Sequence, residues 1–246
     1  MNPETKTCLN CGAEVTGKFC TECGQPVSTP ARITATTFGK AVRQSFGRMS
    51  TGFFITCWHL MYKPWDVIRD YLRGRRMRYT QPFTLFLQVF FLSAVLESFL
   101  EKIFGNRITG EDDIKPTSNW FVNMLIESDF VIGILISFPF IMAVYLAYWK
   151  FGSRRFNVYE YIVAFFYMMS VMRIYDFLLL PLLLIDENLQ YAVLYVIFGI
   201  LGVGITLKAF PIKPWWKNML ILLWSTFIFI VIVNILYRVH YFFFWF

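Results

Sequence analysis

Charged residues are scarce in this 246-residue chain. Asp, Glu, Lys and Arg make up 16% of the sequence, whereas hydrophobic residues make up 57% and aromatic residues 20%. With this composition the whole chain cannot be an ordinary soluble globular protein. The sequence also lacks a recognisable nucleophile, an acid–base pair and a cofactor-binding loop. The composition therefore favours a membrane protein and leaves catalysis without a candidate residue.

A secretory leader is missing as well. Residues 1–37 are polar and contain no apolar core of the kind that a signal peptide needs. We therefore expect the N-terminus to stay in the cytosol. Membrane-grade segments, which need about 20 apolar residues to cross a bilayer, begin only after Gln81. Hydropathy predicts five transmembrane helices in residues 81–246, at about 83–100, 130–149, 157–180, 189–207 and 216–237.

The distribution of positive charge predicts the orientation of these spans. Of 23 Lys and Arg residues, 12 precede the first span, three lie between the second and third, and three lie between the fourth and fifth. Cytoplasmic loops carry an excess of such residues. We therefore expect a multi-pass protein of a bacterial cytoplasmic (inner) membrane, with the N-terminus inside and the C-terminus outside. On this interpretation the net charge of +7 reflects topology.

Four of the five cysteines form two C-x-x-C-G motifs near the N-terminus: Cys8, Cys11, Cys20 and Cys23. Two such pairs complete a tetrahedral thiolate shell, so the spacing predicts a structural Zn²⁺ ion in a small ribbon over residues 1–26. A redox dithiol pair and two disulfides are the alternatives, and a reducing cytosol disfavours both. The glycine after each pair favours a turn with positive φ.

The fifth cysteine, Cys57, lies in the apolar stretch 53–62 beside His59. We interpret Cys57 as a buried structural thiol. A redox or metal role shared with His59 is the alternative.

Residues 27–37 have the composition of a flexible linker, and residues 38–80 predict basic amphipathic helices at the membrane interface. Within them, Pro64 and Asp66 favour the start of a helix, and Gly74 favours its end.

Four arginines lie shortly before the first predicted span: Arg73, Arg75, Arg76 and Arg78. Such a cluster orients a transmembrane helix and attracts anionic lipids. The alternative is a specific site for a phosphate or a lipid headgroup, because guanidinium groups chelate phosphate well.

The same region resembles an uncharacterised bacterial family of multi-pass membrane proteins with an N-terminal zinc ribbon. The resemblance covers roughly residues 8–90 and is carried by the C-x-x-C-G pairs and by Lys63-Pro64-Trp65, Ile68 to Arg76, Tyr79 and Pro82-Phe83. Trp65 stands where the family usually has Gly, and Arg75 where it has Lys. The resemblance implies a cytosolic zinc ribbon joined to several transmembrane helices, and no assigned activity.

One charged pair lies inside a predicted span. Arg173 and Asp176 are three residues apart, so they can share a helix face and pair. Ionisable residues in a membrane mark polar pathways or binding sites, but the position of this pair towards the outer leaflet, where long side chains reach the interface, favours a structural ion pair. Three glycines in the fourth span, Gly199, Gly202 and Gly204, predict close helix packing or a local bend of the helix.

These features rank three functions. The first is a non-catalytic membrane adaptor or sensor whose zinc ribbon docks a cytosolic protein. The second is a small transporter or lipid-handling permease that uses Arg173 and Asp176, and the third is an enzyme acting on a phosphate-containing lipid. Nucleic acid is an unfavourable partner, because Lys6 and Lys18 are outnumbered by acidic residues in the ribbon segment. A homo-oligomer is compatible with the sequence.

Overall fold

The computed structural model describes residues 6–28, 32–45, 52–104, 143–151, 156–183 and 187–228, together with residue 231. The chain divides into two compact units, Met1–Ala94 with Asn157–Phe210 and Val95–Phe156 with Pro211–Phe246. The first unit contains a small sheet and most of the helices. In the second unit, residues 143–151 and 216–228 are helical.

The N-terminal sheet consists of two short antiparallel strands, β1 (Lys6–Thr7) and β2 (Glu14–Val15). An isolated bridge joins Phe19 to Pro26. Within residues 6–28 the buried apolar core consists of Cys8, Val15 and Cys20, and partly buried apolar residues pack against it: Ala13, Cys23 and Val27. A core of this size cannot stabilise a fold by hydrophobic burial alone, so this segment needs a cross-link or a bound metal.

Three short helices follow: α1 (Ala35–Ser45), α2 (Phe53–Tyr62) and α3 (Pro64–Leu72). Helix α1 begins inside the segment 27–37 that we expected to be a linker, of which residues 29–31 lie outside the described residues. The three helices fall largely within the segment 38–80 for which amphipathic helices were predicted. Residues 46–51 of that segment lie outside the described residues.

The start and stop signals of α3 are confirmed. Pro64 occupies its first turn and Asp66 follows in that turn, where a carboxylate is favourable beside the helix N-terminus. After the helix ends, Gly74 adopts a φ of 91°, which a residue with a Cβ atom rarely adopts. Helix α3 therefore ends where the sequence predicts, and the arginine segment begins at once.

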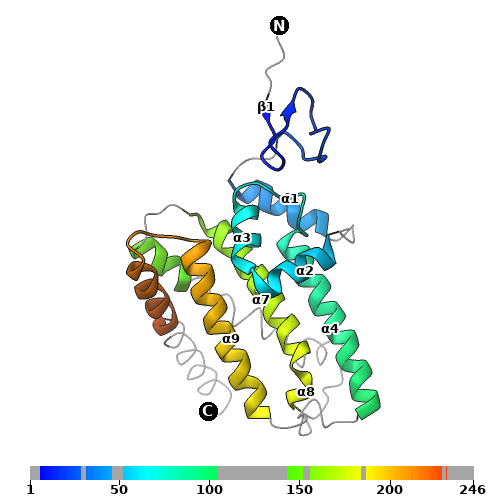
Figure 1. Ribbon diagram of the computed structural model, residues 1–246, viewed down its shortest axis with the longest axis vertical. Coiled ribbons are helices and arrows are strands. Elements are labelled where there is room, and N and C mark those ends of the chain that lie inside the picture. Colours follow the sequence, from blue (N-terminus) through cyan, green and yellow to red (C-terminus); the bar gives the residue numbers. More distant parts are fainter. Residues whose placement is uncertain are drawn as a thin grey trace, which may run out of the picture. The chain divides into compact units, whose positions relative to one another are not determined.

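Four further helices of the described residues are α4 (Pro82–Phe104), α7 (Val158–Leu178), α8 (Leu180–Leu183) and α9 (Glu187–Lys208). Within the first unit, α7 lies between α9 and the first part of α4 (Figure 1). Helix α3 packs against both α7 and α9, and α2 packs against α3 and α7. Tyr167, near the middle of α7, is fully buried and donates a hydrogen bond of 2.7 Å to the backbone oxygen of Thr80.

The first turn of α7 is held by a reciprocal cap. The side chain of Asn157 accepts from the backbone N–H of Glu160 at 3.0 Å, and the carboxylate of Glu160 accepts from the backbone N–H of Asn157 at 2.7 Å. The N-terminal segment reaches the same turn. Asn157 Nδ2 donates to the oxygen of Ile33 at 2.7 Å, and Arg32 lies 3.5 Å from the Glu160 carboxylate.

A mostly helical chain with one candidate span is supported, but the five predicted spans are not. Among the described residues, one helix, Val158–Leu178, is long and apolar enough to cross a membrane. The apolar stretches of α4 and α9 are shorter, Pro82–Leu96 and Ala192–Lys208. In the sequence, charged residues follow the first stretch from Glu97 onward, and polar residues precede the second. Residues 130–142 of the predicted span 130–149, and residues 229, 230 and 232–237 of the span 216–237, lie outside the described residues. One such helix supports membrane association.

Helix α9 approaches α3 closely at Gly204. A Cβ atom built on Gly204 would lie 2.7 Å from Cε3 of Trp65, and the Lys208 ammonium lies 3.9 Å from the centre of the same indole ring. The close packing predicted for the glycines of this segment is thus confirmed at Gly204. At Gly199 an added Cβ would meet nothing within 4 Å.

This contact gives a testable prediction. Gly204→Ala is expected to lower the free energy of unfolding by about 1–3 kcal/mol, because the rigid indole and the α9 backbone must separate. Gly199→Ala is the matched control and should leave stability unchanged or raise it, since alanine favours a helix over glycine by up to about 1 kcal/mol. Unfolding in detergent with increasing dodecyl sulfate measures both variants. Equal stability of the two would contradict the packing of Trp65 on Gly204.

Candidate functional site

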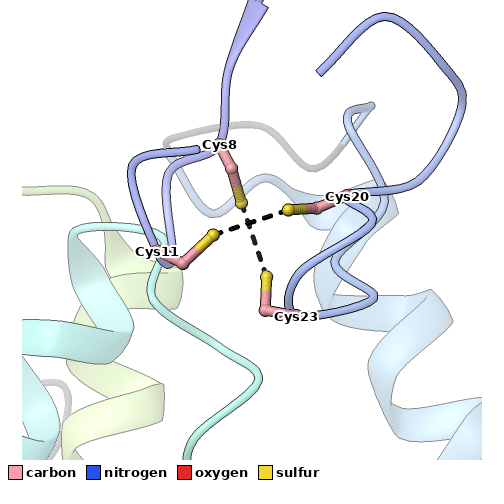
Figure 2. Close-up of side chains that lie close together, drawn as sticks. All are labelled: Cys8, Cys11, Cys20 and Cys23. Carbon is pink, nitrogen blue, oxygen red and sulfur yellow. Dashed lines mark hydrogen bonds between the residues drawn. The ribbon is translucent and has the colours of Figure 1, made fainter. Parts of the chain in front are cut away.

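The first cysteine motif forms a tight knuckle. The backbone N–H of Cys8 donates to the oxygen of Ala13 at 2.8 Å, and the N–H of Gly12 donates back to the oxygen of Cys8 at 2.9 Å. Gly12 has a φ of 81°, as the sequence predicts for the position after the second cysteine. The turn directs the thiols of Cys8 and Cys11 to the same side (Figure 2).

The second motif repeats this geometry. The N–H of Cys20 donates to the oxygen of Gln25 at 2.9 Å, the N–H of Gly24 donates to the oxygen of Cys20 at 2.9 Å, and Gly24 has a φ of 73°. The two knuckles face each other, so that all four sulfur atoms surround a common centre (Figure 2).

The four sulfur atoms are arranged as a metal shell requires. Cys8 Sγ lies 3.6 Å from Cys23 Sγ, and Cys11 Sγ lies 3.5 Å from Cys20 Sγ. All four lie within 4.8 Å of one another. A tetrahedral ion with bonds of about 2.3 Å to sulfur separates its ligands by roughly 3.8 Å. The four cysteines therefore fit a tetrahedral thiolate site, and the structure brings together the ligands that the spacing predicts.

The thiols differ in their tendency to ionise. Hydrogen bonds from the backbone, chiefly that of Cys11, lower the pKa of the Cys8 thiol from 9.0 to about 6. The backbone near Ala13 lowers the pKa of Cys11, but contacts with the other thiols, chiefly Cys20, together with burial raise that pKa to about 12. One thiolate therefore forms readily, whereas a cation is needed to offset the repulsion among four.

Cys57 lies on α2, away from this cluster. Burial raises the pKa of its thiol to about 11, so at neutral pH it is protonated and a weak nucleophile. The neighbouring His59 contacts the backbone oxygen of Ile55 through Nδ1 at 2.7 Å. The four-cysteine cluster in the described ranges does not include either residue.

The knuckles are bonded to the arginine segment. The buried side chain of Gln25 donates from Nε2 to the oxygen of Gly74 at 3.0 Å, and its Oε1 accepts from the backbone N–H of Arg76 at 3.4 Å. Asn10, between the first two cysteines, accepts from the N–H of Met77 at 3.4 Å. Sequence analysis did not single out either amide, because their partners lie 49 to 67 residues away.

The four arginines do not form one surface. Arg73, Arg75 and Arg78 are exposed, and Arg75 lies 3.6 Å from the Asp70 carboxylate. Arg76 is half-buried, and its guanidinium lies 5.4 Å from the centre of the Tyr71 ring. Burial lowers the pKa of Arg76, although the group keeps its charge at neutral pH. The inward position of Arg76 separates it from the other three.

The charged pair in α7 is confirmed and extended. Arg173 Nη1 donates to Asp176 Oδ2 at 2.7 Å. Arg173 Nε also donates to Ser93 Oγ on α4 at 3.0 Å, and Gln190 Nε2 on α9 donates to Asp176 Oδ1 at 3.0 Å. We call these four residues the three-helix network. The sequence does not reveal Ser93 or Gln190 as members, because each is an ordinary polar residue near one end of an apolar stretch.

Comparison with known proteins identifies a family match in the first unit. Residues 51–94 match a family described as "Protein of unknown function (DUF3667)". This segment holds α2, α3, the arginines and the first part of α4, which overlaps the block on which the family resemblance depended. No curated protein and no solved structure matches the chain. The match therefore supports a domain of unknown function in this region.

Proposed function

We propose that the chain is a non-catalytic membrane adaptor or sensor, in which a zinc-loaded cytosolic ribbon docks a partner protein and a helical bundle anchors it. The site geometry supports a role without catalysis. Four cysteine ligands close the coordination shell of a tetrahedral ion, whereas a catalytic zinc keeps a position open for water or substrate.

Zinc is the metal that we propose for this site. Four thiolates in tetrahedral arrangement suit Zn²⁺ or iron, and C-x-x-C pairs at this spacing are typical of zinc ribbons. Because the buried core of the ribbon is limited to Cys8, Val15 and Cys20, the ion would supply most of the folding free energy of this segment.

The connection between the ribbon and the helices is the observation on which the proposal chiefly depends. Gln25 follows the second knuckle directly and bonds to Gly74 and Arg76, and the segment after Arg76 leads into α4 within a few residues. Arg32 and Ile33 contact the first turn of α7. A change in the ribbon therefore has a bonded route to two helices, as an adaptor that signals across a membrane requires.

The ribbon also offers side chains for docking. Leu9 is 42% exposed and Phe19 is 60% exposed. Each is next to a cysteine of the cluster in the sequence, so its backbone is held by the knuckle while its side chain faces solvent. Exposed apolar residues of this kind, together with a rigid backbone, are typical of protein contact sites. The ribbon segment is nearly balanced in charge, which favours a protein over nucleic acid as the partner.

This proposal predicts that Phe19→Ser removes a bound partner without removing the metal. The partner is a protein that co-purifies with the wild-type chain in stoichiometric amount. Phe19→Ser should weaken its affinity at least tenfold, because removing a hot-spot side chain costs about 1.4 kcal/mol of binding free energy or more. Native mass spectrometry reports the partner and the metal together. Lys18→Gln, which changes an exposed neighbour, should keep both. Unchanged partner binding by Phe19→Ser would contradict docking through this face.

The membrane arrangement belongs to the same proposal. We infer a multi-pass protein of a bacterial inner membrane, with five spans, the ribbon in the cytosol and the C-terminus outside. The apolar length of α7, the distribution of Lys and Arg and the abundance of apolar residues after residue 81 support this inference. Anionic lipids are the expected neighbours of the exposed arginines.

A small transporter or permease is the second candidate, and the three-helix network favours it. Its charged pair on α7 is bonded to polar side chains from α4 and α9, and ionisable residues within an apolar bundle are costly and often functional. In liposomes, transport by such a protein should be lost in Asp176→Asn, which keeps the shape of the side chain. Transport at the wild-type rate by a well-folded Asp176→Asn protein would remove this candidate.

A further inference from the structure

Arg76 has an unpaired, buried edge. Its Nε and Nη2 atoms are inaccessible to solvent and have no hydrogen-bond partner among the residues that the structure describes. These two nitrogens lie along one edge of the planar guanidinium group, and their N–H bonds point in the same direction. This is the edge that binds two oxygens of a phosphate or carboxylate at once.

The unpaired edge is costly for the protein. A charged group that is withdrawn from water and left without hydrogen bonds destabilises a fold, yet contacts hold the side chain in place. The Tyr71 ring lies under the guanidinium, and the backbone N–H of Arg76 is bonded to Gln25 of the ribbon. Nearby, the Glu160 carboxylate is already engaged by Arg32 and by the backbone of Asn157.

The surroundings favour a phosphate as the missing partner. Arg73, Arg75 and Arg78 are exposed within three residues of Arg76, so they raise the local concentration of anions. The segment also lies directly before α4, which begins at Pro82. An arginine segment that adjoins an apolar helix is at the level at which lipid phosphates occur.

We propose that Arg76 is the specific ligand of a phosphate oxyanion, bound in bidentate fashion by Nε and Nη2, while Arg73, Arg75 and Arg78 attract anions without selecting them. The oxyanion belongs to a lipid headgroup or to free phosphate. Because both nitrogens are covered, entry of the ligand requires neighbouring side chains to shift. This site is independent of the docking role proposed for the ribbon.

Calorimetric titration of the full chain in a maltoside detergent, which contains no phosphate, tests the proposal. The probes are inorganic phosphate and dioctanoyl phosphatidic acid, each at constant ionic strength in chloride. We expect saturable binding of one equivalent to the wild type, and at least tenfold weaker binding to Arg76→Gln. The control Arg73→Gln, which removes one exposed charge, should weaken binding about twofold or less. Arg76→Lys should recover only part of the affinity, because an ammonium group cannot form two parallel bonds.

The two probes separate the sources of the ligand. Binding of both identifies a site for the free oxyanion, and binding of the lipid alone identifies a headgroup site. If the wild type binds neither probe, or if Arg76→Gln and Arg73→Gln weaken binding equally, the proposal is wrong. Metal content and thermal unfolding establish that each variant is folded. If Arg76→Gln does not fold, comparison of wild type with Arg76→Lys decides, and equal affinity of these two overturns the bidentate site.

Discussion

Replacing Cys20 with serine is expected to abolish stoichiometric metal binding and to unfold residues 6–28. Cys20 is 2% exposed and supplies one of the four sulfur atoms of the cluster. Structural zinc contributes about 10–16 kcal/mol to the folding of small zinc domains, and the ribbon has almost no other core. Elemental analysis of the purified protein measures the metal, and amide hydrogen exchange measures the unfolding of the ribbon.

Cys57→Ser is the matched control, because it removes a thiol that lies outside the cluster. It should retain the metal and the slow exchange of the ribbon amides. Because Gln25 bonds to Gly74 and Arg76, the unfolding in Cys20→Ser should also speed amide exchange in residues 73–77. A Cys20→Ser protein with full metal content would show that the thiol cluster is not the metal site.

Removing the Arg173 side chain is expected to destabilise the helices by about 1–3 kcal/mol, the cost of leaving a part-buried carboxylate without its charged partner. Arg173→Met keeps much of the apolar stem but leaves the Asp176 carboxylate with Gln190 as its remaining partner among the contacts described above. The side chains of Arg173 and Asp176 are 12% and 29% exposed, so hydration offsets part of the loss. Unfolding in detergent with dodecyl sulfate measures the change.

The double variant Arg173→Met, Asp176→Leu provides the test of pairing. Because it leaves no unpaired charge, it should be more stable than Arg173→Met alone. Ser93→Ala, which removes one neutral acceptor of Arg173, should cost only about 1 kcal/mol. If the double variant is as unstable as the sum of the single changes, the two residues do not depend on each other.

Local sequence signals predicted the local structure well. The spacing of the cysteines and the glycine after each pair predicted the two knuckles, because a C-x-x-C-G turn is closed by bonds within six residues. The beginning and end of α3 were predictable for the same reason, since Pro64 and Gly74 act on their own backbone.

Contacts between distant segments could not be predicted in this way. Nothing in Ser93 or Gln190 by itself indicates a bond to Arg173 or Asp176, because these contacts depend on how three helices are rotated relative to one another. The same holds for Arg76. Four arginines in six residues have equal charge, and the one that faces inward is distinguished by contacts with distant or folded neighbours, the hydrogen bond of its backbone to Gln25 and the packing of its guanidinium on the Tyr71 ring.

The number of spans was the least secure prediction, for a physical reason. Hydropathy averages over a window, so it extends an apolar stretch across the charged residues at its end. In α4 the helix continues to Phe104, but the apolar stretch ends at Leu96. Helix length and apolar length therefore differ, and the sequence pattern alone does not separate them.

Asn157 links the order of synthesis to the order of assembly. Its side chain both closes the first turn of α7 and holds the oxygen of Ile33, a residue 124 positions earlier in the chain. Because translation proceeds from the N-terminus, Ile33 has already left the ribosome when Asn157 emerges, and its bond to Asn157 can form as soon as α7 begins to fold. A circular permutation that moved the N-terminal segment behind α9 would reverse this order, so that α7 would form with its own Asn157–Glu160 cap but without the bond to Ile33.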